Sequence, residues 1–248
     1  MDIQTVARPE SAAKVGVWQG TIALLLPTLN ELEGLKSTVP LIDRSLVDEI
    51  IVIDGGSTDG TVEYAMEMGL TVVSQLRPGL HYAIFDICHT ITHDCVIEFS
   101  PDGNCMVEHL PELVSKLREG YDHVVVSRYL EDAVSHDDHL VTAFGNWLFA
   151  RLMRPLADFP ITDALNIYRG YIRKIILDPD LEFYMKGPVL EPLIGGICAL
   201  RGLRATEIPG DEPVRIGGAT KRRIFYNGSL CLLMIARLYV RKFLGLRL

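Results

Sequence analysis

Short, unbroken apolar runs alternate with amphipathic stretches through the first half of the chain. Runs such as Ile22–Leu26 and Ile50–Ile53 contain no polar residue and are rich in leucine and β-branched side chains. Such runs are typical of strands buried on both faces, and their alternation with amphipathic segments is typical of a parallel sheet with crossover helices. The strands predicted from this pattern are Ile22–Leu26, Glu49–Ile53, Thr71–Ser74, Val96–Phe99 and Val124–Ser127.

The amphipathic stretches between these strands predict helices. One is expected to begin near Asn30, and a second to be capped by Thr58 or Asp59. After Tyr129 the pattern changes, and the charged segment Glu131–His139 is predicted to be a mobile lid. The other predicted elements are the helices Gly79–Ile91, Val107–Arg118, Leu140–Met153, Tyr171–Leu177, Val189–Leu200 and Ile224–Leu244, a strand-like segment Ala164–Tyr168 and an edge strand Arg204–Ile208. Trp147 and Phe149 are expected in the core.

Composition and charge exclude several classes of protein. The formal net charge of −8 argues against a nucleic-acid-binding protein. The five cysteines form no CxxC pair and no disulfide-rich spacing, which predicts reduced core cysteines in a cytoplasmic protein. No segment has the roughly 20 consecutive apolar residues of a membrane-spanning helix. Residues 1–20 lack the apolar centre of a signal peptide and are predicted to be a loose leader.

The end of the chain is basic. Residues 213–248 contain no Asp or Glu, and the cations there are Arg215, Lys221, Arg222, Arg223, Arg237, Arg241, Lys242 and Arg247. This asymmetry predicts an anionic partner, such as phosphates or a membrane surface. Residues 222–248 are expected to form a basic amphipathic helix that suits a membrane interface. Packing of this helix on the protein itself, or on a second subunit of a homo-oligomer, is the alternative.

A polar turn follows the predicted strand Val96–Phe99. Ser100 to Asn104 reads SPDGN, a tight turn at the carboxyl end of a strand, which is where open α/β sheets bind ligands. Asp102 and Asn104, two residues apart, can both offer hard oxygen ligands to a divalent cation. Taken alone, the same turn is equally compatible with a simple solvated loop.

Two further polar turns follow the first and second strands. Pro27–Glu31 reads PTLNE, and Glu31 can accept hydrogen bonds from a ribose or base, or serve only as a first-turn helix carboxylate. Asp54–Thr61 reads DGGSTDGT, where two glycines let a ligand approach the backbone and Asp54 can bind a nucleoside. Neither turn contains GxGxxG or GxxxxGK[ST], which excludes the dinucleotide-binding and P-loop motifs.

Together these motifs resemble the family-2 glycosyltransferases with the GT-A fold, and in particular the dolichyl- and polyprenyl-phosphate mannose synthase group. The resemblance rests on PTLNE, VIDGGSTDGT and the D-x-N turn, followed by SRYL, DALNIYR and RIGGATK in the same order. It spans about residues 21–221 and implies an α/β, Rossmann-like, mostly parallel sheet flanked by helices over that range. Residues 222–248 would then be a C-terminal helical extension.

The resemblance also implies roles for individual residues. A nucleotide-sugar donor would be held at its nucleoside by Pro27, Glu31 and Asp54, and at its diphosphate by Arg215 and Lys221. A divalent cation, Mg²⁺ or Mn²⁺, would be bound by Asp102 and Asn104. The residues implied near the acceptor phosphate are Arg128, Arg151 and Arg169.

Departures from the family pattern leave some of these roles open. The first aspartate of the usual metal-binding turn is Ser100 here, which implies a weaker metal site or a metal held mainly by the diphosphate. DALNIYR keeps only its Asp and Arg, so the acceptor is less well defined. Asp163 is the candidate general base if the acceptor is a sugar hydroxyl, whereas a phosphate acceptor needs no base. An N-cap or ion-pair role for Asp163 is equally compatible with the sequence.

The sequence therefore predicts a metal-assisted, inverting glycosyltransferase in the cytoplasm, peripheral on the cytoplasmic face of the membrane. The expected donor is a GDP- or UDP-sugar, and the expected acceptor is a polyprenyl phosphate or a lipid-linked glycan. One alternative is a non-catalytic nucleotide-sugar-binding or scaffold subunit, because Ser100 replaces an acid. A sugar-1-phosphate nucleotidyltransferase is disfavoured, because residues 27–34 contain no Gly-rich loop with Arg and Lys.

Overall fold

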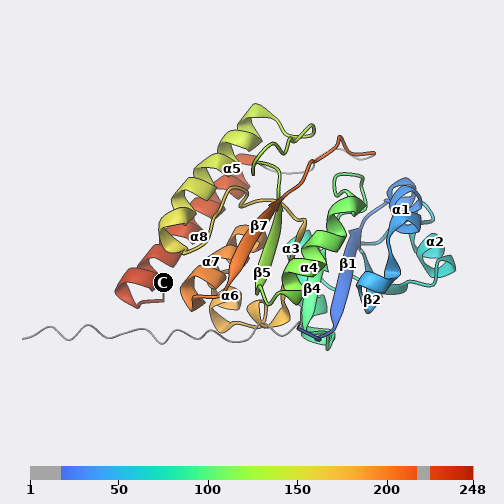
Figure 1. Ribbon diagram of the computed structural model, residues 1–248, viewed down its shortest axis with the longest axis horizontal. Helices are drawn as coiled ribbons and strands as arrows, with labels where there is room; N and C mark the ends of the chain where they lie inside the picture. Colours follow the sequence, from blue (N-terminus) through green and yellow to red (C-terminus); the bar gives the residue numbers. More distant parts are fainter. Residues whose placement is uncertain (1–17, 217–223, 248) are drawn as a thin grey trace, which may run out of the picture.

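The computed structural model describes residues 18–216 and 224–247 of the chain. Its centre is a mostly parallel sheet with the strand order β3-β2-β1-β4-β6-β5-β7 (Figure 1). All pairs are parallel except those of β6, which runs antiparallel to both of its neighbours, β4 and β5. The strands are β1 (Ile22–Thr28), β2 (Glu49–Asp54), β3 (Thr71–Ser74), β4 (Cys95–Glu98), β5 (His123–Ser127), β6 (Arg169–Ile172) and β7 (Ala205–Pro209).

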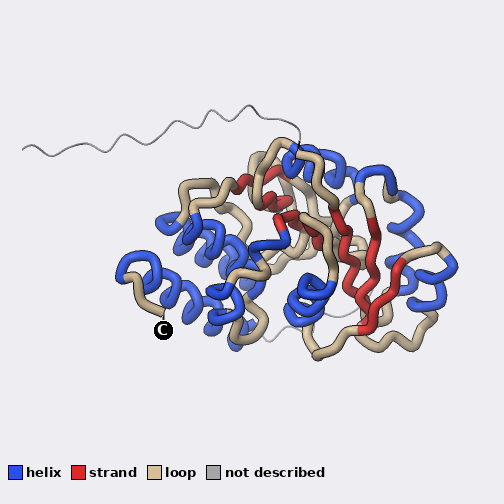
Figure 2. The backbone as a smooth tube through the Cα atoms, turned by 90° about the horizontal axis from the view of Figure 1, so that it is seen from below, coloured by secondary structure: helices blue, strands red, loops and turns tan. Residues whose placement is uncertain are grey.

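Helices cover both faces of this sheet (Figure 2). One buried cluster joins the sheet to α3, α5, α6, α7 and α8. A second cluster joins the other face to α1, α2 and α4. The helices are α1 (Leu32–Thr38), α2 (Thr61–Glu67), α3 (Leu80–Thr90), α4 (Leu110–Arg118), α5 (Leu140–Met153), α6 (Pro179–Tyr184), α7 (Leu190–Arg201) and α8 (Ile224–Leu244). The predicted fold class is confirmed, because buried apolar strands lie between two helical layers.

The segment around β6 differs from the prediction. Ala164–Tyr168 is not a strand and Tyr171–Leu177 is not a helix, because Arg169–Ile172 forms β6 and a 3₁₀ turn follows. Before β6, the backbone bonds to nearby side chains instead of to a strand: Asp163 Oδ1 accepts from the Leu165 and Asn166 amides at 3.2 and 3.1 Å. Such local bonds compete with a regular ladder. The position of β6 therefore depends on its pairing with β4 and β5, which lie on either side of it in the sheet.

Both ends of the described chain pack on the domain. The Trp18 amide donates to the Arg118 carbonyl of α4 at 2.9 Å, and the Arg118 guanidinium lies 5.1 Å from the centre of the indole ring. The last residues of the predicted leader thus contact α4, while residues 1–17 lie outside the described residues. At the other end, α8 lies beside α5 and buries Cys231, Met234 and Leu238 against the core (Figure 1).

A buried carboxylate ties the C-terminal helix to the domain. The Asp180 side chain is fully buried on α6 and pairs with Arg201 of α7 at 2.7 Å, with Arg241 of α8 at 3.3 Å, and with Arg247. Burial alone would raise the pKa of Asp180, but the three guanidinium groups outweigh it and lower the pKa. Asp180 therefore joins three helices through one ionised side chain.

Replacing this carboxylate should destabilise the fold. We expect Asp180→Ala to lower the free energy of unfolding by about 3 kcal/mol, because three arginines lose their shared partner in a desolvated site. Urea denaturation measures this change. Arg247→Ala is the matched control and should cost less than about 1 kcal/mol, because its side chain is 43% exposed. Equal losses in the two variants would contradict the central role of Asp180.

Candidate functional site

The three polar turns meet at one edge of the sheet. Thr28 of β1 pairs with Asp54 of β2, and Leu25 of β1 pairs with Glu98 of β4. The Phe99 amide continues this ladder by donating to the Leu25 carbonyl at 3.0 Å. The strands are parallel, so their carboxyl ends lie side by side, as in the ligand-binding crevice of open α/β sheets.

The first two turns are fastened to each other. Asn30 lies in the left-handed region, with φ of 59°, which asparagine tolerates. Its Oδ1 accepts from the Thr58 amide at 2.8 Å, and its own amide donates to Ser57 Oγ at 2.9 Å. A second link is made by Asp59 Oδ2, which accepts from the Leu32 amide at 3.1 Å. These bonds hold the two predicted nucleoside-binding turns in one arrangement.

Two of the predicted nucleoside ligands, Pro27 and Asp54, lie at these strand ends. Pro27 is half-buried near the end of β1. The Asp54 side chain is buried, and its carboxylate accepts from the Gly56 and Ser57 amides at 2.9 and 3.1 Å. Asp54 therefore shapes the glycine-containing turn from within.

Glu31, the third predicted nucleoside ligand, is half-buried just before α1. Its pKa is raised from 4.5 to about 6, first by burial and then by the nearby charges of Asp102 and Asp59, while Arg215 acts in the opposite direction. Glu31 thus shares one electrostatic environment with Asp102 and Arg215, two residues that are far from it in sequence. The fold brings these three predicted site residues together.

Asp102 and Asn104 present oxygen atoms at the tip that follows β4. Asp102 Oδ1 accepts from the Asn104 amide at 3.2 Å. The Asn104 side-chain Nδ2 donates to Asp137 Oδ2 at 3.2 Å, which fixes the orientation of the amide. Asn104 Oδ1 is buried and has no hydrogen-bond partner among the described residues. A buried acceptor without a donor is costly, so this oxygen is suited to an external partner.

Helix α1 packs directly on this tip. Gly34 is buried, and a Cβ atom there would collide with the Pro101 carbonyl oxygen. Thr38 of the same helix donates to that carbonyl at 3.4 Å. The close approach requires glycine at position 34, and it holds the SPDGN turn beside the turn that carries Glu31.

Arg215 reaches the tip from the far end of the chain. The Ile216 amide donates to the Asp102 carbonyl at 2.7 Å, and Arg215 Nε donates to Asp137 Oδ2 at 3.1 Å. The hydrogen bond to Asp137 raises the pKa of Arg215. Burial opposes ionisation of Asp137, but Arg215 and Asn104 outweigh it and lower the pKa of that carboxyl. Lys221, predicted beside Arg215, lies outside the described residues.

Asp137 is a site residue that sequence reasoning missed. It lies in the charged segment Glu131–His139, which was predicted only as a lid. The segment contacts the chain near Arg215 through backbone bonds as well, because the His136 amide donates to the Glu212 carbonyl at 2.8 Å. No local sequence pattern signals this contact, because Arg215 lies 78 residues further along the chain.

The oxygen atoms of Asp102 and Asn104 suit a hard divalent cation whose remaining ligands are phosphate oxygens. Within residues 18–216 and 224–247, no group of three or more His, Cys, Asp or Glu residues is placed to hold a metal by itself. Asp102 and the unpartnered Asn104 oxygen would nevertheless supply two oxygen ligands to a cation bound there. Mg²⁺ in particular is commonly bound by one or two carboxylates plus substrate phosphates. This arrangement agrees with the Ser100 substitution, which removes one protein ligand.

Arg128 and Asp163 form a buried ion pair. Arg128 Nε donates to Asp163 Oδ2 at 2.6 Å, and Arg128 also pairs with Glu212 at 3.1 Å. Burial of Asp163 favours its neutral form, but Arg128 outweighs that effect and lowers the pKa. A carboxylate with a lowered pKa and several internal donors is a poor general base. The ion-pair alternative for Asp163 is therefore the arrangement that the structure shows.

Of the three predicted acceptor-phosphate arginines, Arg128 and Arg169 are buried and Arg151 is exposed. The Arg169 side chain is 1% exposed, and its guanidinium donates to the carbonyls of Asn166 at 2.8 Å and Glu191 at 2.6 Å. Backbone carbonyls therefore hold the guanidinium in place, and phosphate binding by Arg169 stays a prediction. Arg151 is exposed on α5, eleven residues or about 16 Å beyond Leu140 at the start of that helix. Phosphate binding by Arg128 or Arg151 stays a prediction.

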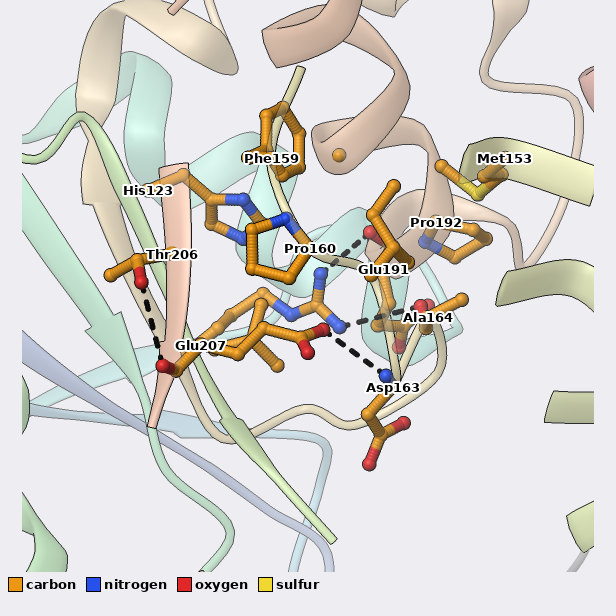
Figure 3. A pocket seen from close by; sticks show the side chains of 14 residues that line it. His123, Met153, Phe159, Pro160, Asp163, Ala164, Glu191, Pro192, Thr206 and Glu207 are labelled. Carbon is orange, nitrogen blue, oxygen red and sulfur yellow. Dashed lines mark hydrogen bonds between the residues drawn. The ribbon is translucent and has the colours of Figure 1, made fainter. Parts of the chain in front are cut away.

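A small cavity of about 20 Å³ lies beside Asp163, with room for about one water molecule (Figure 3). His123, Glu191 and Glu207 line it, and the Asp163 carboxylate points away from it (Figure 3). Both ring nitrogens of His123 lack a partner among the described residues. Burial, together with the charge of Arg169, keeps the pKa of His123 well below its usual range. This cavity is separate from the strand-end site.

Comparisons with known proteins agree with this geometry. The chain is 29% identical over 212 residues to the dolichyl-phosphate hexose transferase of Haloferax volcanii, covering 84% of this chain and 89% of that protein. It is 28% identical over 232 residues to glycosyltransferase AglJ of the same organism, covering 84% and 76% of the two chains.

Among solved structures, the fold is similar to glucosyl-3-phosphoglycerate synthase of Mycobacterium tuberculosis in complex with Mn²⁺ and UDP-glucose. The TM-score is 0.60, the identity is 26%, and the match covers 90% of this chain and 79% of the other. Residues 23–178 match the family described as glycosyl transferase family 2. The chain is therefore a glycosyltransferase and belongs to glycosyl transferase family 2.

Proposed function

We propose that this enzyme transfers a sugar from a GDP- or UDP-sugar to a polyprenyl phosphate, with inversion at the anomeric carbon. The observation that carries the proposal is the meeting of Asp102, the unpartnered Asn104 oxygen and Arg215 at the carboxyl end of β4. These groups suit the diphosphate of a nucleotide sugar. The two turns at Glu31 and Asp54, fastened to each other beside them, suit its nucleoside.

The charges on the diphosphate side support a role in leaving-group departure. When the anomeric C–O bond breaks, the nucleoside diphosphate leaves with the electron pair and gains negative charge. A bound Mg²⁺ or Mn²⁺ would supply Lewis-acid stabilisation of that charge. Asp102 and Asn104 would hold the cation, and Arg215 would donate to the phosphate oxygens. A solved structural neighbour is described with Mn²⁺ and UDP-glucose, which supports a divalent cation.

The state of Asp163 supports a phosphate acceptor. An acceptor hydroxyl must lose a proton during transfer and benefits from a general base, whereas a phosphate oxygen is already anionic. Asp163, the candidate base, is committed to Arg128, and its pKa is lowered. The name of one relative, dolichyl-phosphate hexose transferase, describes a phosphorylated polyprenol. In our proposal the acceptor phosphate attacks the anomeric carbon from the face opposite the diphosphate.

A polyprenyl phosphate acceptor places the reaction at a membrane surface. No helix in residues 18–216 and 224–247 has both the length and the apolar character to span a bilayer. We propose that the protein associates peripherally with the cytoplasmic face of the membrane, because a polyprenyl phosphate acceptor lies in the membrane and nucleotide-sugar donors would reach the enzyme from the cytoplasm.

Removing the Asp102 carboxylate should abolish transfer. We expect Asp102→Ala to lower the transfer rate by about 100-fold or more, because the cation loses its only protein carboxylate. Calorimetric titration with GDP and with UDP, each with and without Mn²⁺, should show metal-dependent binding in the wild-type protein and its loss in the variant. Glu33→Ala, which removes an exposed carboxylate from the first turn of α1, is the matched control and should bind normally. Full activity of a folded Asp102→Ala protein would refute the assignment.

Glu31 should make nucleotide binding depend on pH. Its pKa is raised to about 6, so its carboxyl changes from mostly neutral to mostly ionised around that pH, and the ionised form is the stronger acceptor for a ribose or base donor. We expect the affinity of wild-type protein for the nucleotide to rise between pH 5 and pH 7, and Glu31→Gln to flatten this part of the profile. Titration of the nucleotide phosphate affects both proteins equally, so the difference between the two profiles isolates Glu31. Superimposable profiles would exclude Glu31 from the nucleoside site.

A further inference from the structure

Large apolar side chains are exposed at the beginnings of α5 and α8. Leu140 is 91% exposed, Phe144 60% and Trp147 58% on α5, while Phe225 on α8 is 87% exposed. Phe149 is buried as expected, but Trp147 is not in the core as predicted. We call this set the apolar end surface: Leu140, Val141, Phe144, Trp147, Phe225 and Tyr226.

The two helices bring these side chains to the same end of the molecule. A Cβ atom on Gly228 of α8 would lie 3.8 Å from Phe149 of α5, and farther along, the Tyr239 hydroxyl donates to the Leu152 carbonyl at 2.7 Å. The contacts advance in the same direction along both helices, so α5 and α8 run side by side and parallel (Figure 1). The first turns of the two helices, with their exposed apolar side chains, therefore lie at the same end of the helix pair.

An arginine follows the apolar residues on each helix. On α5, Leu140, Phe144, Trp147 and Arg151 follow the spacing of one helical face. On α8, Tyr226, Leu233 and Arg237 do the same. In the described part of the chain, neither Arg151 nor Arg237 has an ion-pair partner. Each arginine lies about 16 Å along its helix from the first apolar residue of the face.

The cations at the other end of α8 are not available in the same way. Arg241 and Arg247 pair with Asp180, and Lys242 donates to the Leu156 carbonyl. The sequence predicted membrane binding through the basic amphipathic character of this helix. The structure instead uses those charges to hold α8 on the domain. Apolar side chains are exposed at both ends of α8, with Phe225 and Tyr226 at its beginning and Phe243 and Leu244 at its end. The end of the helix differs in that its cations are already paired, whereas Arg237 has no ion-pair partner among the described residues.

The apolar end surface also adjoins the donor site. α5 begins three residues after Asp137, whose carboxylate bonds Asn104 and Arg215. A lipid chain resting on the first turns of α5 and α8 would therefore lie next to the segment that contacts the diphosphate-binding groups. This is the position that a membrane-embedded acceptor requires.

We propose that the apolar end surface enters the boundary of an anionic lipid membrane, with Arg151 and Arg237 contacting lipid phosphates. The inference deepens the proposed function, on which it rests for the lipid acceptor, by naming the surface that meets the membrane. Apolar side chains gain free energy in the acyl boundary, and arginines behind them can bind phosphate groups there. Arg151 thus contacts a headgroup phosphate rather than the phosphate of the acceptor.

Vesicle binding tests this proposal. In Trp18→Phe protein, Trp147 is the remaining tryptophan, and its emission should shift to shorter wavelength on vesicles of equal parts phosphatidylcholine and phosphatidylglycerol. Flotation of the wild-type chain with the same vesicles is an independent measurement. We expect Phe144→Ser/Phe225→Ser to lower vesicle affinity about 10-fold or more. Arg151→Gln/Arg237→Gln should weaken binding to these vesicles but not to phosphatidylcholine alone.

The control removes exposed apolar side chains elsewhere. Leu41→Ser/Met66→Ser changes two residues, 65% and 61% exposed, on the side of the sheet that α1 and α2 cover, and it should bind vesicles like the wild type. Phe144, Phe225, Leu41 and Met66 are all exposed, so neither Phe144→Ser/Phe225→Ser nor Leu41→Ser/Met66→Ser should affect folding. Equal loss of binding in the control would overturn the proposal, as would a folded wild-type protein that does not bind vesicles.

Two further outcomes separate this inference from the proposed function. Transfer to a short, water-soluble prenyl phosphate should be unchanged in Phe144→Ser/Phe225→Ser, while transfer to a long-chain acceptor in vesicles falls. Vesicle binding that depends on the surface, without transfer to any prenyl phosphate, would support the inference and refute the function. A dimer in solution that this double variant dissociates, without vesicle binding, would assign the surface to a second copy and overturn the membrane proposal.

Discussion

The pairing of β1 with both β2 and β4 is the constraint on which the site depends. The parallel ladders at β1 fix where the three strands end. Thr28 lies opposite Asp54 at the ends of β1 and β2, and Glu98 at the end of β4 lies opposite Leu25, three residues before the end of β1. A slip of one residue would turn every side chain of a strand to the opposite face. The buried apolar residues of these strands forbid such a slip, because both faces are covered by helices. The packing of the core thereby determines where the polar turns stand.

The site is held partly by groups that a ligand would displace. Arg215 pairs with Asp137, and the same carboxylate accepts from Asn104. A diphosphate with its cation would compete with Asp137 for Arg215 and would satisfy the Asn104 oxygen that has no partner. In the proposed function Arg215 binds the donor, and the Asp137 carboxylate already holds the Arg215 side chain in position. Exchange of one acidic partner for another is less costly than ordering a free arginine, whose side-chain entropy is large.

The arginines of the chain fall into two groups, those buried in the interior and those at the surface. Arg128 and Arg169 lie in the core, and their guanidinium groups are bonded to carboxylates or to backbone carbonyls. Desolvated charges need such partners, so an acceptor phosphate would have to compete with these internal bonds. Arg151 and Arg237, by contrast, are free to meet an external anion. Burial, and not the presence of an arginine in a motif, decides which of these residues are free of such competition.

The sequence by itself determined most of the elements and the order of the motifs. Unbroken apolar runs specify buried strands, and SPDGN, PTLNE and DGGSTDGT mark where those strands end, because local turn chemistry and burial act over a few residues. Tertiary structure alone decided that Arg169–Ile172 is an antiparallel strand, since that position depends on the space between β4 and β5. It also decided that Asp137 joins the site and that Trp147 faces outward. These outcomes depend on contacts between residues distant in the chain, which no local pattern encodes.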